Sequence, residues 1–141
     1  MNRLVTRVWF CLPFVIVAVI DAALTLHGQD DQYWDGAYAE ANEIFAFFAQ
    51  ALMQGPGAFL RLFAAWIAAF CIVILVLPAF LAEALAFALV MGHAWGCMTW
   101  LLYDLEVRYE ISLLFFAAVA LFHVFSMRMA RRRINGPVDQ P

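Results

Sequence analysis

Four long apolar runs dominate the pattern of hydrophobic and polar positions along the chain. They extend over residues 8–26, 58–77, 81–102 and 111–127, and most charged residues fall at or beyond their ends. Each run is long enough to cross roughly 30 Å of hydrocarbon at a rise of about 1.5 Å per residue. The pattern therefore predicts an all-α membrane protein, with four transmembrane helices forming a single domain over residues 1–141.

The connection between the first two runs contains a shorter amphipathic element. Its apolar side chains recur at helical spacing, at Ile44, Phe47, Phe48, Ala51 and Leu52. Asn42 is a suitable N-cap, Glu43 would lie in the favourable first turn, and a Gly-Pro-Gly sequence follows at residues 55–57. About a dozen residues are too few to span a bilayer. We therefore expect a helix over residues 42–54 that lies in the membrane interface or folds back over the bundle.

Composition supports a membrane location. Hydrophobic residues make up 67% of the chain and charged residues 13%, whereas soluble domains carry about 25% charged residues. A soluble core of this length cannot bury so much apolar surface, so the bilayer must act as the solvent. Membrane lipids are the expected surroundings, and we expect no nucleic-acid partner.

The distribution of arginine predicts the orientation. All eight basic residues are Arg, with Arg3 and Arg7 before the first run and Arg128 and residues 131–133 at the end of the last. An even number of spans places both termini on one side, and the excess of Arg makes that side cytoplasmic. The opposite side carries mainly acidic residues, among them Asp30, Asp31, Asp35, Glu40, Glu43, Asp104, Glu106 and Glu110.

Four ionisable residues stand inside the apolar runs. They are Asp21, Glu83, His93 and His123. An Asp at the centre of a membrane helix costs at least about 2.5 kcal/mol, so such groups normally face the bundle interior and find partners. By rise per residue, Asp21 and His93 both lie about 20 Å from the cytoplasmic end, and Glu83 and His123 about 3–6 Å from it. Two acid–histidine pairs are therefore possible, although each group can also be satisfied locally.

Further polar groups extend the deeper pair towards the outside. His93, Cys97 and Asp104 share one face of the third run, and Thr25 follows one turn after Asp21. Together they predict a polar seam, which is either functional or a hydrogen-bonded helix contact. The three cysteines, at positions 11, 71 and 97, have no metal-ligand spacing and are expected to be buried free thiols.

Gly92 and Gly96 form a Gly-x-x-x-Gly motif on the third run. Small residues at this spacing let two helix backbones approach closely. We expect this face to be a helix–helix contact.

No sequence motif predicts a catalytic residue, a bound cofactor or a metal. Cys-x-x-Cys-His, His-Glu-x-x-His, Gly-x-Ser-x-Gly and phosphate-binding loops are all missing from the sequence. A haem held between His93 and His123 is disfavoured because their depths differ by about 12 Å. Ser112 and Ser126 lie near the ends of their run, where a buried nucleophile is not expected.

Residues 21–61 resemble a family of small bacterial membrane proteins known as a domain of unknown function. The resemblance rests on Asp21-x-x-Leu24-Thr25, Gly28, Glu40-x-Asn42 and Gly57-Ala58-Phe59-x-Arg61. Where the family has Pro after the Asn, this chain has Glu43. The resemblance implies a compact helical protein of the bacterial inner membrane and no particular activity. It also implies an outer polar cluster of Asp21, Thr25, Glu40, Asn42 and Arg61, in which Arg61 pairs with acidic loop residues.

Three functions fit these observations. The favoured one is a non-catalytic accessory or scaffold subunit that packs through its helices into a larger membrane assembly or a homo-oligomer. Its support is the lack of catalytic motifs together with the small-residue helix faces, 14 Phe and 5 Trp. The alternative is a small oligomeric transporter or proton-linked channel that uses Asp21 and His93. A membrane enzyme or quinone-type site at the polar seam ranks third.

Overall fold

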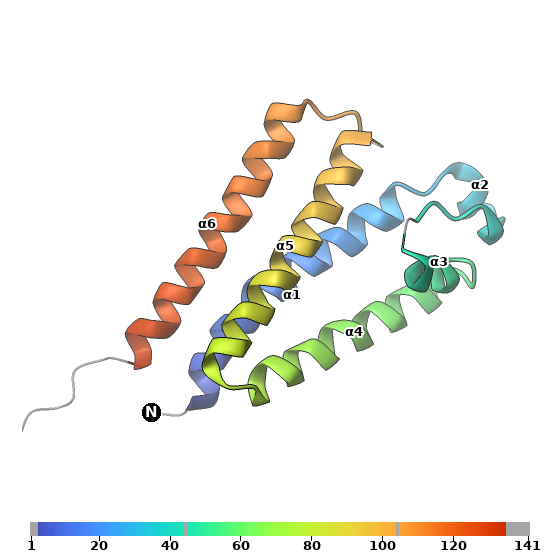
Figure 1. Ribbon diagram of the computed structural model, residues 1–141. Coiled ribbons are helices and arrows are strands. Elements are labelled where there is room, and N and C mark those ends of the chain that lie inside the picture. The colour runs from blue at the N-terminus through green and yellow to red at the C-terminus, as the bar shows by residue number, and fades with distance from the viewer. Residues whose placement is uncertain (1–2, 44, 104, 135–141) are drawn as a thin grey trace, which may run out of the picture.

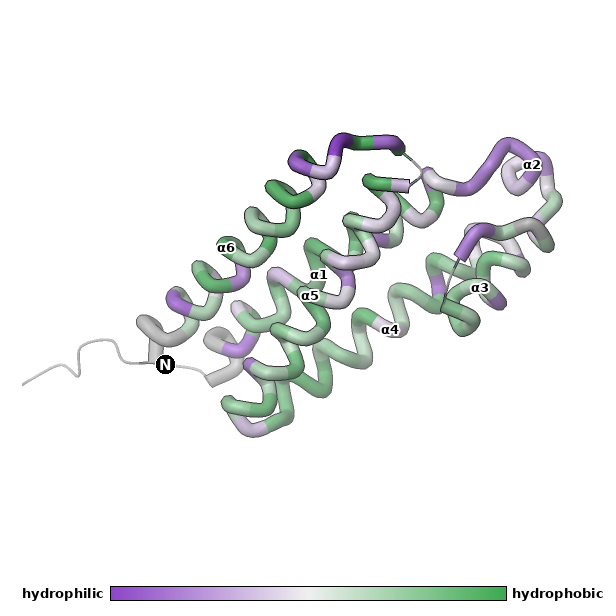
Figure 2. Tube along the Cα trace, turned by 45° about the horizontal axis from the view of Figure 1, so that its top comes forward, coloured by the Kyte–Doolittle hydropathy of each residue, from purple (hydrophilic) through white to green (hydrophobic). Residues whose placement is uncertain are grey.

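The computed structural model describes residues 3–43, 45–103 and 105–134, and it confirms the four long helices. They are α1 (Arg3–His27), α4 (Pro56–Val76), α5 (Ala79–Tyr103) and α6 (Tyr109–Ile134). By length and composition, each is able to cross a membrane. Figure 2 shows hydrophobic residues along these helices and hydrophilic residues gathered in the connections at one end. We call this end the loop end, and the opposite end, where α1 begins and α6 finishes, the terminal end.

Helix α1 is central to the packing. It contacts α4, α5 and α6, and Figure 1 shows it passing behind α5, between α4 and α6. Small or β-branched side chains on α5 follow one another every three or four residues and are fully buried, at Ala82, Ala86, Val90, Ala94 and Cys97. Such a row lets helices pack closely in lipid, where no hydrophobic drive brings them together.

Helix α4 joins this group mainly at the terminal end. The Arg7 guanidinium donates a hydrogen bond to the Leu75 carbonyl, one of the last carbonyls of α4, which lack partners inside the helix. The Cys11 thiol donates to the Cys71 carbonyl at 3.9 Å. Pro78 follows the extended Leu77, so α4 ends there and the chain turns into α5. Towards the loop end α4 diverges from α1 and α5, and α3 (Ala46–Leu52) packs on it (Figure 1).

The predicted bounds of the amphipathic loop helix are wrong. Helix α3 is seven residues long and its N-cap is Phe45, not Asn42. The cause lies in competing hydrogen bonds: the Asn42 backbone is held by another side chain, and the Glu43 carboxylate accepts from the Phe45 N–H at 2.8 Å. Of the two predicted placements, the structure has the helix folded over the bundle, packed on α4 with its own Ala51 and Leu52 buried.

Two short elements precede α3 and hold the loop against it. Helix α2 (Asp31–Trp34) is capped by Asp30, whose carboxylate accepts from the Tyr33 N–H at 2.8 Å, and the 3-10 helix η1 spans Tyr38–Glu40. Tyr33 is fully buried and its hydroxyl donates to the Leu52 carbonyl at 3.3 Å. Burial, and then the nearby Tyr38, raise the pKa of Tyr33, so its hydroxyl stays protonated and remains a donor.

Candidate binding pocket

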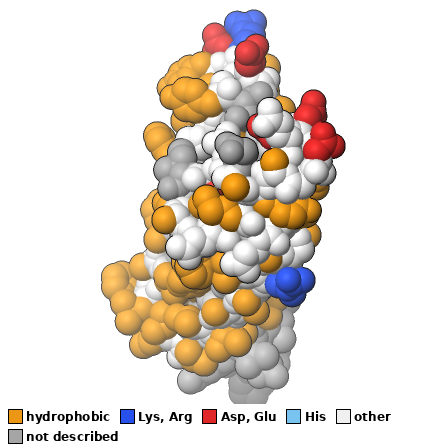
Figure 3. All heavy atoms as spheres, turned by 90° about the vertical axis from the view of Figure 1, so that its right-hand side faces the viewer, with side chains coloured by type: hydrophobic (Ala, Val, Ile, Leu, Met, Phe, Trp, Pro, Cys, Tyr) orange, Lys and Arg blue, Asp and Glu red, His pale blue; other side chains and the backbone are white. Residues whose placement is uncertain are grey.

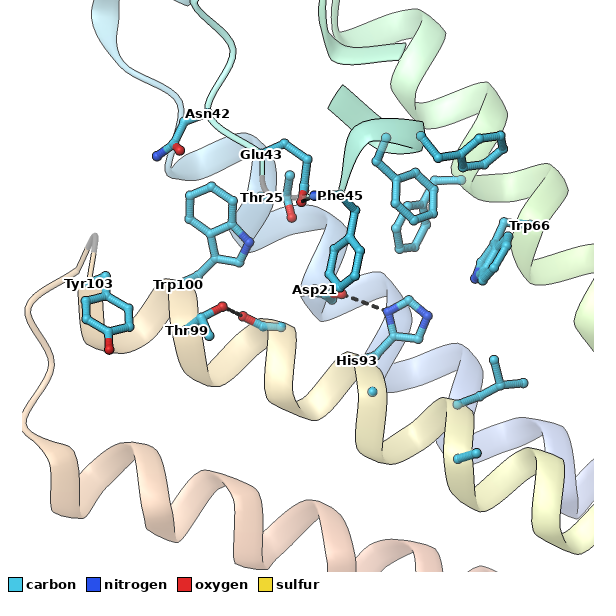
Figure 4. Close-up of a pocket in the computed structure, with 17 residues that line it drawn as sticks. Asp21, Thr25, Asn42, Glu43, Phe45, Trp66, His93, Thr99, Trp100 and Tyr103 are labelled. Carbon is cyan, nitrogen blue, oxygen red and sulfur yellow. Dashed lines mark hydrogen bonds and ion pairs between the residues drawn. The ribbon is translucent and has the colours of Figure 1, made fainter. Parts of the chain in front are cut away.

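Asp21 of α1 and His93 of α5 form a direct pair. His93 Nδ1 lies 2.7 Å from Asp21 Oδ2, and the two side chains are 10% and 14% exposed. Figure 4 shows the pair bridging the two helices at the edge of a hollow. The predicted pairing of these residues is therefore confirmed.

Gly96 makes room for this pair. A Cβ built on Gly96 would lie 2.6 Å from Asp21 Oδ1 and 2.9 Å from Oδ2, closer than real Cβ contacts allow. The carboxylate therefore rests directly on the α5 backbone, one turn from His93. The glycine does permit a close approach, but to a side chain rather than to a second backbone.

Gly92 behaves differently, because it makes no helix–helix contact within the described chain, and a contact with a partner helix stays a prediction. A Cβ built there would meet no described atom within 4 Å. Helix α4 diverges on this side, so Gly92 faces open space instead of a neighbouring helix. It lines the pocket together with Gly96.

The His93 ring is held by aromatic neighbours. It packs against Phe14 of α1 and Phe63 of α4, each with ring centroids 5.6 Å away. With Nδ1 directed at Asp21, an ionised carboxylate selects the tautomer in which Nδ1 carries the proton. Nε2 is then an acceptor, and protonation of the ring would make it a donor. In the described part of the chain Nε2 has no hydrogen-bond partner.

The pair opens on a pocket of about 610 Å³. Its walls come from α1, α4, α5, α3 and the segment before α3 (Figure 4). Besides the pair and the two glycines, the lining consists of Thr25, Asn42, Glu43, Phe45, Phe47, Phe48, Phe63, Trp66, Ala88, Leu89, Thr99, Trp100 and Tyr103. The site is thus mostly apolar, with a few polar groups from α1, α5 and the segment before α3, which is typical of a small-molecule site.

Aromatic side chains form the cover of the pocket. Phe48 of α3 packs on Phe63 and Trp66 of α4, with ring centroids 5.2 and 5.7 Å away. Phe45 and Phe47 are 64% and 54% exposed. Trp66 Nε1 is buried and lacks a hydrogen-bond partner among the described residues. A buried donor without a partner is costly, so a ligand acceptor reaching Trp66 after movement of the covering rings would stabilise the site.

Gln29 fixes the upper wall, and the sequence analysis missed it. Its amide accepts from the Asn42 N–H at 2.8 Å and donates to the Asn42 carbonyl at 2.9 Å and the Thr25 carbonyl at 2.7 Å. One buried side chain thereby joins the end of α1 to the loop. Its position just after an apolar run gives no signal of this role, because a polar residue there is expected to face water.

The other candidates on the predicted seam are only partly brought together. Thr25 and Asn42 line the pocket. Cys97 does not; it is fully buried and its thiol donates to the Val17 carbonyl at 3.8 Å. The prediction that Arg61 pairs with loop acids is wrong for the side chains that the structure describes, where Arg61 is exposed and forms no ion pair. The Glu40 side chain and Asp104 lie outside the described residues.

For the second possible acid–histidine pair, Glu83 and His123, the structure favours the alternative without a direct hydrogen bond. Glu83 and His123 line one groove near the terminal end. His123 is 6% exposed, and its Nδ1 has no hydrogen-bond partner within the described chain. The two side chains line the same groove, but in the part of the chain that the structure describes no hydrogen bond joins them.

Comparison with protein-family models, with curated proteins and with solved structures finds no match for this chain. The resemblance to the family of small bacterial membrane proteins therefore stays a prediction from its motif residues. Among the described residues, no three His, Cys, Asp or Glu side chains are grouped so as to hold a metal ion.

Proposed function

We propose that this protein binds a lipid-soluble amphipathic molecule in the pocket, with the Asp21–His93 pair as the polar anchor. The observation that carries the proposal is the pair itself, which opens on an aromatic pocket inside a helical bundle. Ionisable residues at this depth are expensive and usually functional. A pocket of about 610 Å³ lies within the usual range for small-molecule sites.

The polar groups favour a ligand with a hydroxyl- or carbonyl-bearing head. His93 Nε2 accepts from a hydroxyl in one protonation state and donates to a carbonyl in the other. The Trp66 N–H, on the α4 wall in Figure 4, supplies a second donor. A flat head would lie between aromatic rings, and an apolar tail would follow the Phe side chains of α3.

The exposed side of α5 supports entry from the lipid. Ala88 and Gly92 are exposed there, and Tyr103 is 79% exposed, although all three line the pocket. A ligand can thus enter between α4 and α5 without crossing water. In the orientation predicted from arginine, in a bacterial inner membrane with both termini cytoplasmic, this opening faces the outer leaflet.

The test is to identify what the pocket retains. Protein purified from its own membranes in mild detergent is extracted with organic solvent, and the extract is analysed by mass spectrometry. Gly92→Phe should fill the pocket, while Ala118→Phe on the exposed face of α6 is the matched control. We expect one enriched compound in the wild type and control that is lost in Gly92→Phe. Equal recovery from all three proteins, or bulk lipid alone, contradicts the proposal.

A second candidate is the accessory subunit predicted from the sequence. Gly92 favours this candidate. A Cβ built there meets no described atom within 4 Å, so this small-residue face is open to close packing by a partner helix. Cysteine crosslinking in native membranes from position 88 or 92 distinguishes the candidates. A specific protein adduct supports the subunit, and its absence, combined with a retained compound, supports the binding pocket.

We rank the hypothesis of a transporter or channel lower. A path from the pair to the terminal end would have to pass Phe14 and Val90, which are fully buried where α1 and α5 pack. Transport would therefore need a second conformation of these helices or an oligomer. Proton uptake by vesicles containing the purified protein, compared between wild type and Asp21→Asn, measures it.

A further inference from the structure

A second hollow lies near the terminal ends of α5 and α6. It measures about 460 Å³ and is lined by Phe80, Glu83, Ala84, Phe87, His123, Val124, Met127 and Arg128. It shares no lining residue with the pocket at Asp21. The proposal below therefore stands or falls separately from the proposed function.

The groove holds charges of both signs. Glu83 on α5 contributes a carboxylate, and Arg128 on α6 an exposed guanidinium. The groove is also lined by His123, a polar side chain more than nine-tenths buried, whose Nδ1 has no hydrogen-bond partner in the described structure. Its ring packs on Phe87 with centroids 5.5 Å away. A buried polar atom without a partner in a groove points to a missing ligand.

We propose that this groove binds the zwitterionic headgroup of an aminophospholipid of the phosphoethanolamine type. The primary ammonium pairs with the Glu83 carboxylate. The phosphate accepts from the Arg128 guanidinium and from an N–H of His123, which the ring can present by turning about its last torsion. Basic pockets between membrane helices are known to hold lipid headgroups, and here the added acid selects the amine.

The apolar surroundings suit the rest of the lipid. Phe80 is 79% exposed, and Phe87 and Val124 are 51% and 48% exposed beside the charged groups. Acyl chains can lie along these side chains towards the middle of the helices. Figure 3 shows another face of the molecule, where charged side chains, mostly acidic, gather at the loop end and hydrophobic side chains cover much of the rest.

The charges discriminate against two common headgroups. An anionic glycerol headgroup offers no cation to Glu83 and is repelled by it. A choline headgroup has a quaternary ammonium, which cannot donate a hydrogen bond to the carboxylate. The groove should therefore prefer phosphatidylethanolamine to phosphatidylglycerol and phosphatidylcholine.

Native mass spectrometry with the three synthetic lipids measures this preference. The full chain, delipidated in mild detergent, is titrated with each lipid and the bound fraction is recorded. Free phosphoethanolamine in the same assay shows whether the headgroup binds without its chains. The variants are Glu83→Gln, Arg128→Gln and Arg128→Lys, and the matched controls are Arg108→Gln and Glu110→Gln, an exposed ion pair at the loop end.

We expect wild type and both controls to prefer phosphatidylethanolamine by about two- to fivefold, the range of a partly exposed charge pair. Glu83→Gln should abolish this preference and increase phosphatidylglycerol binding. Arg128→Gln should weaken all three lipids, and Arg128→Lys should restore them in part. Equal binding of the three lipids by the wild type, or an unchanged preference in Glu83→Gln, would overturn the proposal. Ratios between lipids stay interpretable if a variant folds less well.

Discussion

Two acid–histidine pairings connect helices of this bundle, and the structure treats them differently. Asp21 and His93 are hydrogen-bonded at 2.7 Å beside a large pocket. Glu83 and His123 line a groove near the terminal end without a hydrogen bond between them. An acid and a histidine thus form a hydrogen-bonded contact in one region and line an open, charged groove in the other.

The difference follows from depth and from the neighbouring backbone. Near the middle of the span an unpaired carboxylate is expensive, and Gly96 lets Asp21 settle on α5 next to His93. Near the end of a span, Glu83 can also reach water or lipid headgroups, so its charge is less costly there than that of Asp21. A buried pair therefore requires backbone space for both side chains, and not merely two residues at equal depth.

The largest expected effect is loss of the deep pair. Asp21→Ala leaves the buried His93 Nδ1 without its acceptor and should destabilise the protein by about 3 kcal/mol. Asp21→Asn should lose less, because its amide oxygen still accepts. Thermal melting in detergent measures both, with Glu83→Ala as the counterpart at the other pair, expected to lose less than about 1 kcal/mol. Equal losses of stability in Asp21→Ala and Glu83→Ala would contradict the proposed difference between the two acid–histidine pairs.

The two glycines of α5 sharpen the comparison further. Gly96→Ala should break the Asp21–His93 contact, because the new Cβ overlaps the carboxylate. Gly92→Ala meets open space and should stabilise the helix by up to about 1 kcal/mol through helix propensity. Opposite shifts in melting temperature are expected from the same substitution one turn apart. Parallel shifts would show that the carboxylate does not rest on Gly96.

Gln29 tests whether the pocket wall depends on a single side chain. Gln29→Leu removes three hydrogen bonds to the Asn42 and Thr25 backbones and should cost about 1–3 kcal/mol of local stability. Hydrogen exchange at the Asn42 amide should accelerate, whereas amides in the buried part of α5 should not change. Gln54→Leu is the control, since its exposed amide bonds only within its own turn. Unchanged hydrogen exchange at the Asn42 amide in Gln29→Leu would show that the Gln29 side chain does not hold the loop.

The smallest effect is expected at His123. His123→Phe replaces a polar ring that lacks a hydrogen bond at Nδ1 with an apolar ring of similar shape, which should be nearly neutral or slightly stabilising in detergent. His93→Phe should destabilise clearly, because it leaves the Asp21 carboxylate without its partner. If melting curves show that His123→Phe lowers stability as much as His93→Phe, then Glu83 and His123 form a hydrogen-bonded pair in solution.

The sequence was sufficient to predict the four long helices and the Asp21–His93 pair, but not the pocket beside the pair. Apolar run length placed all four long helices, and the rise per residue placed Asp21 opposite His93. These features depend on local pattern and on the cost of burying charge, which can be read from the sequence. For Glu83 and His123 the same reasoning left a pair and local satisfaction both open, because matched depth does not say whether two side chains meet.

The pocket could not be predicted, because it depends on the direction that α4 takes. The divergence of α4 leaves Gly92 bare, and no residue pattern within α5 signals it. The start of α3 was also misplaced, since the Gln29 side chain takes the Asn42 backbone that would otherwise begin the helix. Both features arise from contacts between segments distant in sequence.

The central claim is that the Asp21–His93 pair anchors a ligand in the pocket. The most direct measurement is native mass spectrometry of the intact protein released from its own membranes, with wild type, His93→Phe and the control His123→Phe compared. Besides any phospholipid held in the groove at Glu83, we expect one discrete added mass at near one-to-one stoichiometry in wild type and His123→Phe, and its loss in His93→Phe. A wild type that lacks this mass, or the same adduct retained by His93→Phe, would contradict it.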